Sequence, residues 1–302
     1  MSTKKTILTP SILVDLSRRY REAVIPGDVA SLAMKLGVSV DSLRRIGIGW
    51  DGAAFAFPMF SGDGTIIGIH RRLPERKICL ARSKLGIFVP CGLVADPLLI
   101  VEGCSDTAAA LTAGFDAIGL PSAGNGFDHA AEFLRRNHRR QVVIVADLDD
   151  AKRTAAGDVR WPGIESAIRL AEVLMPAIPH LHFLLPPDGT KDIRQWLRAS
   201  GADSIRAAVA SAPPVTPAWI NQAWRSVEQN RQRLLQPDWA RQVSAMLAEI
   251  DDPDVRADLR FQFEERVAIA EIDGGLPVDE AERIAFEQVR HEAERIMGRA
   301  EQ

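Results

Sequence analysis

The chain has 302 residues, of which 46% are hydrophobic and 25% are charged, so it is long enough to bury a sizeable core and is not a disordered tail. It contains no run of eighteen apolar residues and no apolar segment near its start, and we therefore expect a soluble, cytoplasmic protein that makes no membrane contact. Its three cysteines, Cys79, Cys91 and Cys104, form no C-x-x-C pair. They predict neither a disulfide framework nor a zinc site built from cysteine.

The formal net charge of −3 hides an uneven distribution along the chain. Residues 1–95 carry 14 Lys and Arg against 7 Asp and Glu, whereas residues 215–302 carry 11 against 18. Because a basic surface attracts polyanions, we expect any polyanionic partner to meet the N-terminal part.

The first part of the chain, residues 1–95, predicts a mixture of helices and strands. Two short helices are expected within residues 28–46, with a break at Gly37. The apolar residues 55–60 and 65–70 flank a glycine-containing turn and predict a β-hairpin.

Short apolar runs alternate with helical patterns between residues 96 and 214. The first and third runs lack the alternation of a half-exposed strand, as is typical of parallel strands that are buried on both faces. Strands separated by helices predict an α/β fold with a parallel sheet covered by helices. The strands are expected at residues 97–101, 117–120, 141–146 and 181–185, and the helices at residues 105–113, 129–137 and 164–174.

The last part, residues 215–302, predicts acidic, amphipathic helices. Between Pro277 and Met297, for example, apolar residues repeat at helical spacing after an acidic first turn. Such helices need a surface to cover their apolar faces, on this chain or on another. We therefore expect three segments, with boundaries after residues 95 and 214.

Carboxylates directly follow two of the predicted strands. Glu102 ends the first strand, and Asp147 and Asp149 end the third. Because ligands of open parallel sheets bind at the carboxyl ends of the strands, these three side chains are expected together. Close carboxylates raise one another's pKa unless a cation compensates them, and oxygen ligands suit Mg²⁺ or Mn²⁺. The pattern therefore predicts a divalent metal site.

Neighbouring residues offer further candidates. Asp106 is either another ligand or the start of a helix, and Lys191 and Asp192 follow the fourth strand at the same edge of the sheet. A nucleophilic role for Cys104 is disfavoured, because no histidine is placed by the sequence to activate it.

These motifs together resemble the toprim domain that bacterial-type primases, topoisomerases and certain nucleases share. The resemblance covers about residues 96–200 and depends on the sequences Leu99-Ile-Val-Glu-Gly103, Val143-Ile-Val-Ala-Asp147-x-Asp149 and Lys191-Asp192. The N-terminal part is similar to the N-terminal subdomain of the primase catalytic core, in the motifs Leu36-Gly-Val-Ser39, Asp63-Gly64 and Arg71-Arg72.

The resemblance implies a toprim sheet flanked by helices, an N-terminal mixed α+β primase-type subdomain and a C-terminal helical segment. It implies Glu102, Asp147 and Asp149 as catalytic residues and metal ligands, with Asp106 and Asp192 as further ligands. The nucleic-acid and nucleotide contacts that it implies are Arg71, Arg72, Arg82, Lys84, Lys152 and Lys191. Residues 151–162 form a longer basic and polar loop than the compact turn of many primases.

The activity implied is Mg²⁺- or Mn²⁺-dependent nucleotidyl transfer, in which a bacterial, phage- or plasmid-type DNA primase makes short primers on single-stranded DNA from nucleoside triphosphates. In this scheme one metal ion activates a 3′-hydroxyl and a second neutralises the triphosphate, or Glu102 acts as the general base. Primases of this family carry a zinc ribbon before the core, which the three cysteines cannot build, so we expect a partner to supply template recognition.

Two alternatives remain open at this point. A toprim nuclease would use the same acidic cluster to hydrolyse a phosphodiester. A non-catalytic accessory protein would bind nucleic acid and dock on a helicase or another replication protein through its C-terminal helices.

Overall fold

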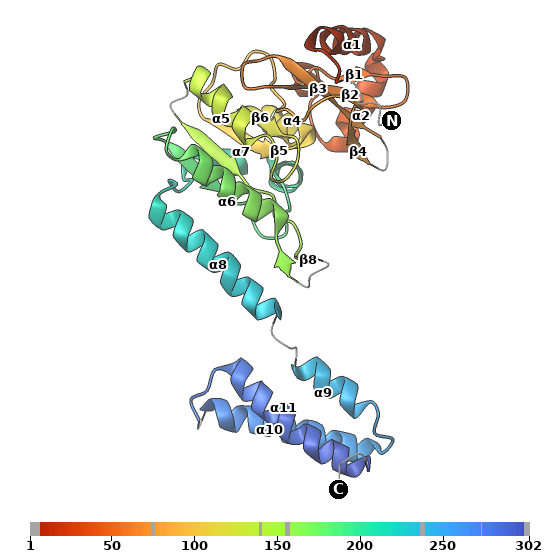
Figure 1. Ribbon diagram of the computed structural model, residues 1–302, viewed down its shortest axis with the longest axis vertical. Helices are drawn as coiled ribbons and strands as arrows, with labels where there is room; N and C mark the ends of the chain where they lie inside the picture. The colour runs from red at the N-terminus through yellow and green to blue at the C-terminus, as the bar shows by residue number, and fades with distance from the viewer. Residues whose placement is uncertain are drawn as a thin grey trace, which may run out of the picture. The chain divides into compact units, whose positions relative to one another are not determined.

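The structure, a computed structural model, describes residues 7–73, 76–138, 141–154, 158–235, 239–272 and 274–298 (Figure 1). The chain forms two compact units, Met1–Glu228 and Gln229–Gln302. Among the described residues, none of the helices combines the length and the apolar character needed to traverse a bilayer. The three-segment division expected from the sequence stays a prediction.

The N-terminal part is an antiparallel sheet with three helices. The sheet has the order β1-β2-β3-β4, and α1 covers it by packing Leu13 against Ala56 and Ile69. Gly37 ends the second helix with a φ of 71°, so the predicted helix break is confirmed, whereas α1 was not predicted. The elements are α1 (Pro10–Ala23), α2 (Pro26–Leu36), α3 (Val40–Arg45), β1 (Gly49–Trp50), β2 (Phe55–Phe60), β3 (Ile66–Arg72) and β4 (Lys77–Cys79).

The central part is a parallel sheet of order β10-β7-β5-β6 that is covered by helices, and the predicted α/β fold class is confirmed. Each of its strands lies within one or two residues of the range that the apolar runs predict. The elements are β5 (Leu98–Glu102), α4 (Cys104–Thr112), β6 (Asp116–Leu120), α5 (Phe127–Arg136), β7 (Val142–Val145), α6 (Pro162–Leu174), β10 (Leu181–Leu184) and α7 (Ile193–Ala210).

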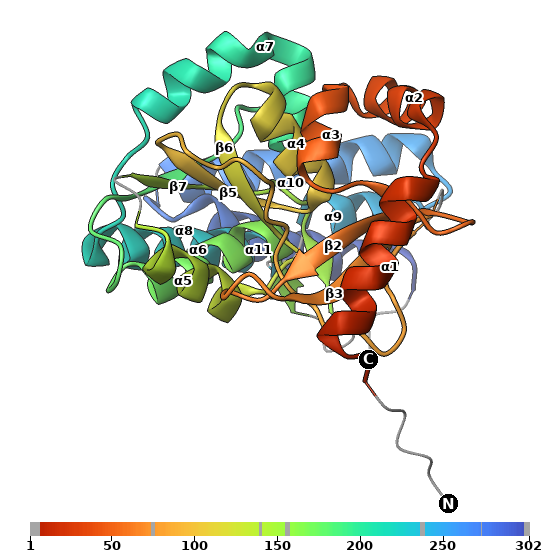
Figure 2. The same ribbon diagram turned by 90° about the horizontal axis from the view of Figure 1, so that it is seen from above.

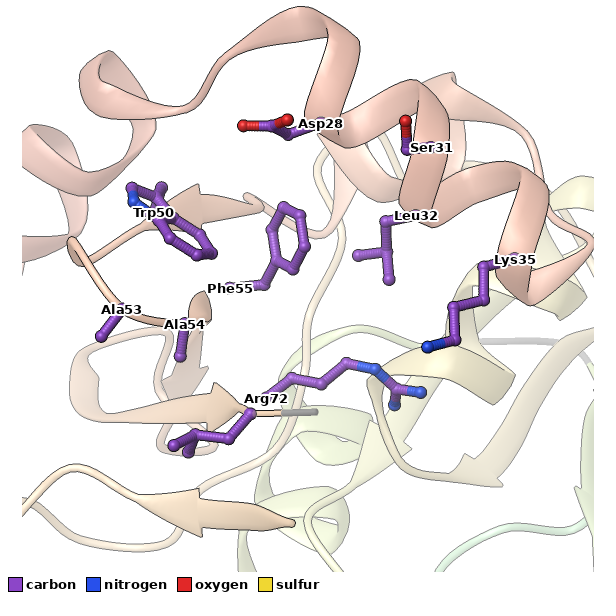
Figure 3. A pocket seen from close by; sticks show the side chains of 10 residues that line it. Asp28, Ser31, Leu32, Lys35, Trp50, Ala53, Ala54, Phe55 and Arg72 are labelled. Atoms are coloured by element: carbon purple, nitrogen blue, oxygen red, sulfur yellow. The ribbon is translucent and has the colours of Figure 1, made fainter. Parts of the chain in front are cut away.

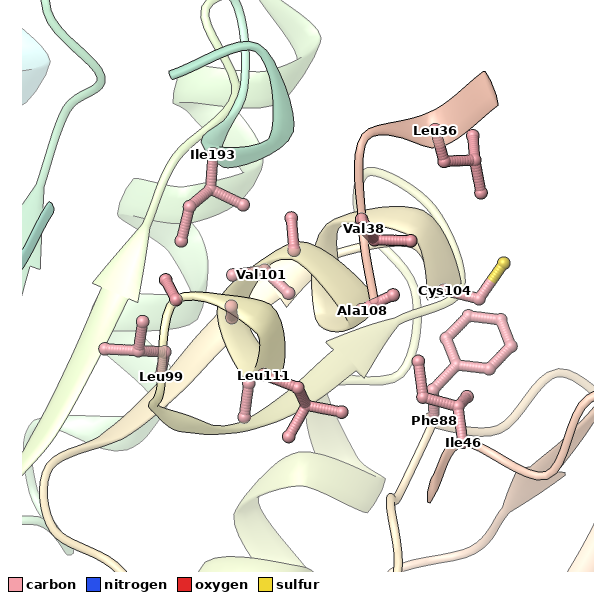
Figure 4. Packing of buried hydrophobic residues seen from close by; sticks show 14 of the residues in the cluster. Leu36, Val38, Ile46, Phe88, Leu99, Val101, Cys104, Ala108, Leu111 and Ile193 are labelled. Atoms are coloured by element: carbon pink, nitrogen blue, oxygen red, sulfur yellow. The ribbon is translucent and has the colours of Figure 1, made fainter. Parts of the chain in front are cut away.

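The two faces of the parallel sheet belong to different hydrophobic cores, because alternate residues of a strand point to opposite sides. Leu99 and Val101 of β5 face α4 and α7 (Figure 4), whereas Leu98 and Ile100 face α5 and α6. Figure 2 shows the two helix pairs on opposite sides of the sheet. Burial on both faces explains why these strands read as continuous apolar runs.

Residues 87 and 88 join the two sheets. The backbone N–H of Ile87 donates to the carbonyl of Phe60 at the end of β2, and the N–H of Phe88 donates to the carbonyl of Gly119 in β6, both at 2.8 Å. The antiparallel sheet is thereby fixed beside the edge of the parallel sheet.

A short hairpin follows β7 where the sequence predicted a loop. It consists of β8 (Lys152–Arg153) and β9 (Val159–Arg160), and its register places Lys152 opposite Arg160. The hairpin returns the chain to the start of α6, where Gly163 lies against Asp147: a Cβ at Gly163 would stand 2.3 Å from the Asp147 carbonyl oxygen. Only glycine fits this approach.

The C-terminal part is helical, as predicted. The first turns of α8 (Pro217–Leu235) pack on the central part through Trp219, whose ring lies 4.5 Å from that of Phe183. The helices α9 (Trp239–Leu247), α10 (Pro253–Ile272) and α11 (Val278–Ile296) share a core of their own that contains Leu247, Phe263 and Val289.

Candidate active site

A polar pocket of about 450 Å³ lies at the carboxyl ends of β5 and β7. Strand β4 of the N-terminal sheet and the start of α7 complete its wall. The pocket contains five carboxylates, three cations and one histidine, so the carboxylates outnumber the cations when all are ionised. The acidic, basic and histidine side chains that line it are Glu102, Asp106, Asp147, Asp149, Asp192, Lys77, Lys191, Arg194 and His70.

The structure brings together the acidic residues that the sequence singled out. Asp147 and Asp149 follow the end of β7, and both line the pocket, whereas the intervening Leu148 does not. The backbone N–H of Leu148 donates to the carbonyl of Lys191 at 2.7 Å. This bond fixes the Asp147–Asp149 segment to the turn that carries Lys191 and Asp192.

Burial and mutual repulsion dominate the electrostatics of the pocket. Desolvation, followed by the charges of Asp106 and Glu102, raises the pKa of Asp147 to about 8. Desolvation and the neighbouring Asp192 raise the pKa of Asp106 to about 7. Desolvation and Asp149 also raise the pKa of Glu102. Each shift reports a carboxylate that lacks sufficient positive charge around it.

Three cations partly compensate these carboxylates. The Lys191 ammonium lies 2.6 Å from Asp149, and this contact raises the pKa of Lys191. The Arg194 guanidinium donates to Asp192 at 3.3 Å, and its Nε lies 3.8 Å from Asp106 Oδ1. Asp192 itself begins α7 by accepting a bond from the N–H of Gln195, so it caps a helix while lining the pocket.

Three lining residues, Lys77, Arg194 and His70, were not predicted from the sequence. Lys77 on β4 is the residue paired with Arg72 of β3, and His70 pairs with Cys79. Desolvation, with the charges of Lys77 and Arg72, lowers the pKa of His70 to about 4, so this imidazole is neutral at physiological pH. The register of the β3–β4 hairpin places Lys77 beside Arg72, and the link through Phe88 and Gly119 fixes this sheet beside the parallel sheet.

The donor set fits a hard divalent cation. Asp106 Oδ1 is buried and accepts no hydrogen bond, and burying such an oxygen without a partner is costly. In the described part of the chain, no three His, Cys, Asp or Glu side chains converge closely enough to ligate one ion between them. Mg²⁺ does not need such a cage, because it commonly takes one or two protein carboxylates and completes its shell with water and phosphate.

The remaining predicted contacts do not line the acidic pocket. Arg71 is paired with Asp51, whose carboxylate also accepts hydrogen bonds from the N–H groups of Ala53 and Ala54 in the loop before β2. Arg82 and Lys84 are exposed on the segment after β4, and Lys152 is exposed on β8.

Arg72 lies in a different pocket, of about 400 Å³, between α2 and the β1–β2 connection. Trp50 and Phe55 form its apolar wall, and Lys35 lies near the Arg72 guanidinium (Figure 3). The Nη1 atom of Arg72 is buried and has no hydrogen-bond partner.

No protein-family model and no curated protein matches the chain, but solved structures do. The E. coli primase catalytic core is similar over 83% of this chain and 95% of its own, at 20% identity and a TM-score of 0.53. The DnaG primase catalytic domain bound to single-stranded DNA is similar over 83% and 96%, at 18% identity and a TM-score of 0.54.

The RNA polymerase domain of Mycobacterium tuberculosis primase DnaG is similar over 85% of this chain and 97% of its own, at 16% identity and a TM-score of 0.51. The fold is thus that of a toprim-containing catalytic core. More particularly, it resembles the cores of DnaG primases.

Proposed function

We propose that the protein is a metal-dependent, primase-like nucleotidyltransferase that extends primers on single-stranded DNA from nucleoside triphosphates. The observation that carries the proposal is the acidic pocket, with its five carboxylates and three cations, in a fold shared with DnaG catalytic cores. One of these similar structures holds single-stranded DNA, which supports the choice of template.

In this proposal Asp147 and Asp149 hold Mg²⁺ or Mn²⁺, with Glu102, Asp106 and Asp192 beside them. A divalent ion bound there supplies positive charge that neutralises phosphate oxygens and favours ionisation of a hydroxyl. The carboxylates are poised for such a charge, because the pKa values of Asp147 and Asp106 are raised to about 8 and about 7 in its absence.

Glu102 serves as the general base for a primer 3′-hydroxyl. Its pKa is raised by burial and by Asp149, which moves it toward the range where a base accepts a proton effectively at neutral pH. The N–H of Ala123 donates to its carboxylate and so holds the base in one orientation.

The three cations of the pocket orient the incoming triphosphate. Lys77, Lys191 and Arg194 present cations around the pocket, and fixed cations stabilise the charge that develops as the pyrophosphate leaves. The neutral His70 adds no positive charge but contributes a buried, unpartnered Nδ1.

The C-terminal helices serve as a docking unit for a helicase or another replication protein. Exposed apolar residues on α10, namely Phe261, Ile269 and Ile272, support this assignment, because their spacing places them on one face of the helix.

A primer-synthesis assay tests the function. The protein is incubated with single-stranded DNA, labelled ribonucleoside or deoxyribonucleoside triphosphates and Mg²⁺ or Mn²⁺. We expect labelled products that grow with time, and a loss of at least 100-fold in Glu102→Gln. Asp150→Asn is the matched control, because Asp150 is exposed and lies next to Asp149 without lining the pocket. Shortening of the DNA without new product would instead identify a nuclease.

A further inference from the structure

A second pocket, of about 350 Å³, lies on the other side of the loop after β6 and is lined by both apolar and charged residues. One face of the β8–β9 hairpin, the first turns of α6 and the loop after β6 form its walls. Three cations, Lys152, Arg160 and Arg169, line it against a single carboxylate, Glu165. We refer to it as the hairpin pocket.

Glu165 holds the two arginines in place. Its side chain is 2% exposed; Arg160 Nε donates to its Oε2 at 2.6 Å, and Arg169 Nη2 lies 3.7 Å from the same atom. The Arg169 guanidinium also lies 5.8 Å from the centre of the Trp224 ring. Even so, the Arg160 and Arg169 side chains remain 39% and 50% exposed. Guanidinium groups that are both fixed and accessible are suited to binding phosphate oxygens.

Lys152 adds a third cation at the same face. Its register partner across the hairpin is Arg160, and like charges placed directly opposite each other destabilise a strand pair. Glu165 in the pocket and Asp158, whose charge also acts on Arg160, are two carboxylates against three cations, so an anion bound here would relieve the remaining repulsion.

The loop after β6 leaves room for such an anion. Gly124 has a φ of 78°, and no atom outside its chain neighbours lies within 4 Å of the position where a Cβ would stand. Its N–H donates to Ser166 Oγ at 2.7 Å, so the loop is fastened to α6 while its outer side stays open. A glycine in this conformation lets a ligand approach the backbone.

The same loop separates the two pockets. Pro121 and Ser122 line the acidic pocket, whereas Ala123 and Gly124 line the hairpin pocket. From Ser122 to Gly124 the chain spans at most about 7 Å, and successive nucleotides of a stacked strand rise by about 3.4 Å. A strand with one end in the acidic pocket therefore reaches the hairpin pocket within a few nucleotides.

We propose that the hairpin pocket binds the phosphodiester backbone of the nucleic-acid strand whose reacting part lies in the acidic pocket. The proposal rests on the proposed function only in taking a polynucleotide as the substrate.

Fluorescence anisotropy with a labelled oligo(dT) of twenty nucleotides tests the proposal in EDTA, where metal-dependent chemistry is absent. The test variant combines Lys152→Ala with Arg169→Gln and retains the Arg160–Glu165 pair. The control combines Arg44→Gln with Arg198→Gln, two exposed arginines on α3 and α7, which cover the other face of the parallel sheet. Both variants lose two positive charges.

We expect the test variant to bind on the order of tenfold more weakly than the wild type. The slope of the logarithm of its binding constant against the logarithm of the salt concentration should be smaller in magnitude by about 1.4, or about 0.7 for each lost contact. The control should bind like the wild type. The proposal would be overturned if the test variant had the affinity and salt dependence of the wild type, or if the control lost as much affinity as the test variant. Tripolyphosphate binding is measured in the same way. A test variant that binds tripolyphosphate more weakly than the wild type but binds oligo(dT) equally well would also overturn the proposal, because the pocket would then bind a free phosphate chain.

The outcome is separable from that of the primer-synthesis assay. If the wild type makes no primers but the test variant alone loses DNA binding, the hairpin pocket stands and the proposed function fails. If primers are made and both variants bind DNA like the wild type, the function stands and the hairpin pocket fails. The melting temperature of each variant, compared with that of the wild type, shows that a lost affinity does not reflect unfolding.

Discussion

Replacing Asp147 by Asn should stabilise the protein in the absence of divalent ions while abolishing its metal binding. Burial and the surrounding carboxylates raise the pKa of Asp147 from 3.8 to about 8. Because the folded value lies above the unfolded one, the folded chain holds an extra proton between these pH values. The wild-type free energy of unfolding therefore falls as the pH rises through this window.

The size of the effect follows from the same shift. At about 1.4 kcal/mol per pKa unit, the full shift corresponds to about 6 kcal/mol. A buried amide retains part of the desolvation cost, so we expect Asp147→Asn to gain about 2–3 kcal/mol at pH 8. For the compact unit Met1–Glu228, which contains Asp147, that gain raises the melting temperature by about 4–12 °C.

Differential scanning calorimetry in EDTA at pH 5 and pH 8 measures this difference. The gain should be present at pH 8 and smaller at pH 5, where the wild-type carboxyl is already protonated. Isothermal titration calorimetry with Mn²⁺ should show binding to the wild type and not to the variant. A variant that melts at or below the wild-type temperature at pH 8 would refute the electrostatic reasoning, and Asp150→Asn controls for a general effect of removing a charge.

Three further changes test other parts of the structure. Lys77→Gln should raise the KM for nucleoside triphosphate about tenfold with a smaller effect on kcat, and an unchanged KM would remove Lys77 from the triphosphate site. Gly119→Ala would place a Cβ 2.1 Å from Thr107 Oγ1 and should cost about 1–3 kcal/mol in urea unfolding; an unchanged midpoint would contradict the close packing. Deleting residues 229–302 should leave Mn²⁺ binding intact, and its loss in calorimetry would show that the two units depend on each other.

The sequence predicted the central sheet well because its strands are buried on both faces. The run Val142–Val145, for example, is apolar throughout, which predicts a buried strand. The carboxylates that follow it predict where the strand ends. The grouping of Asp147 and Asp149 with Glu102 followed from one topological rule about parallel sheets.

Other features depend on contacts between residues that are distant in the sequence. Helix α1 was missed because its mostly polar sequence packs only a few residues, such as Leu13, on the antiparallel sheet. The place of Lys77 in the pocket depends on the link through Phe88 and Gly119 that fixes one sheet beside the other. The β8–β9 hairpin was missed because two-residue strands carry no periodicity.

Because Gly163 lies so close to Asp147, the segment between them can be replaced by one of another length or sequence. The segment leaves the core just after Asp149 and returns at Gly163, whose backbone rests on Asp147. Because its two ends lie next to each other, the length and sequence of the segment between Asp149 and Gly163 have little effect on the positions of the acidic residues. Homologous chains could therefore carry a tight turn, this hairpin or a larger module at the same place, and a protein engineer could graft one there without rebuilding the acidic pocket.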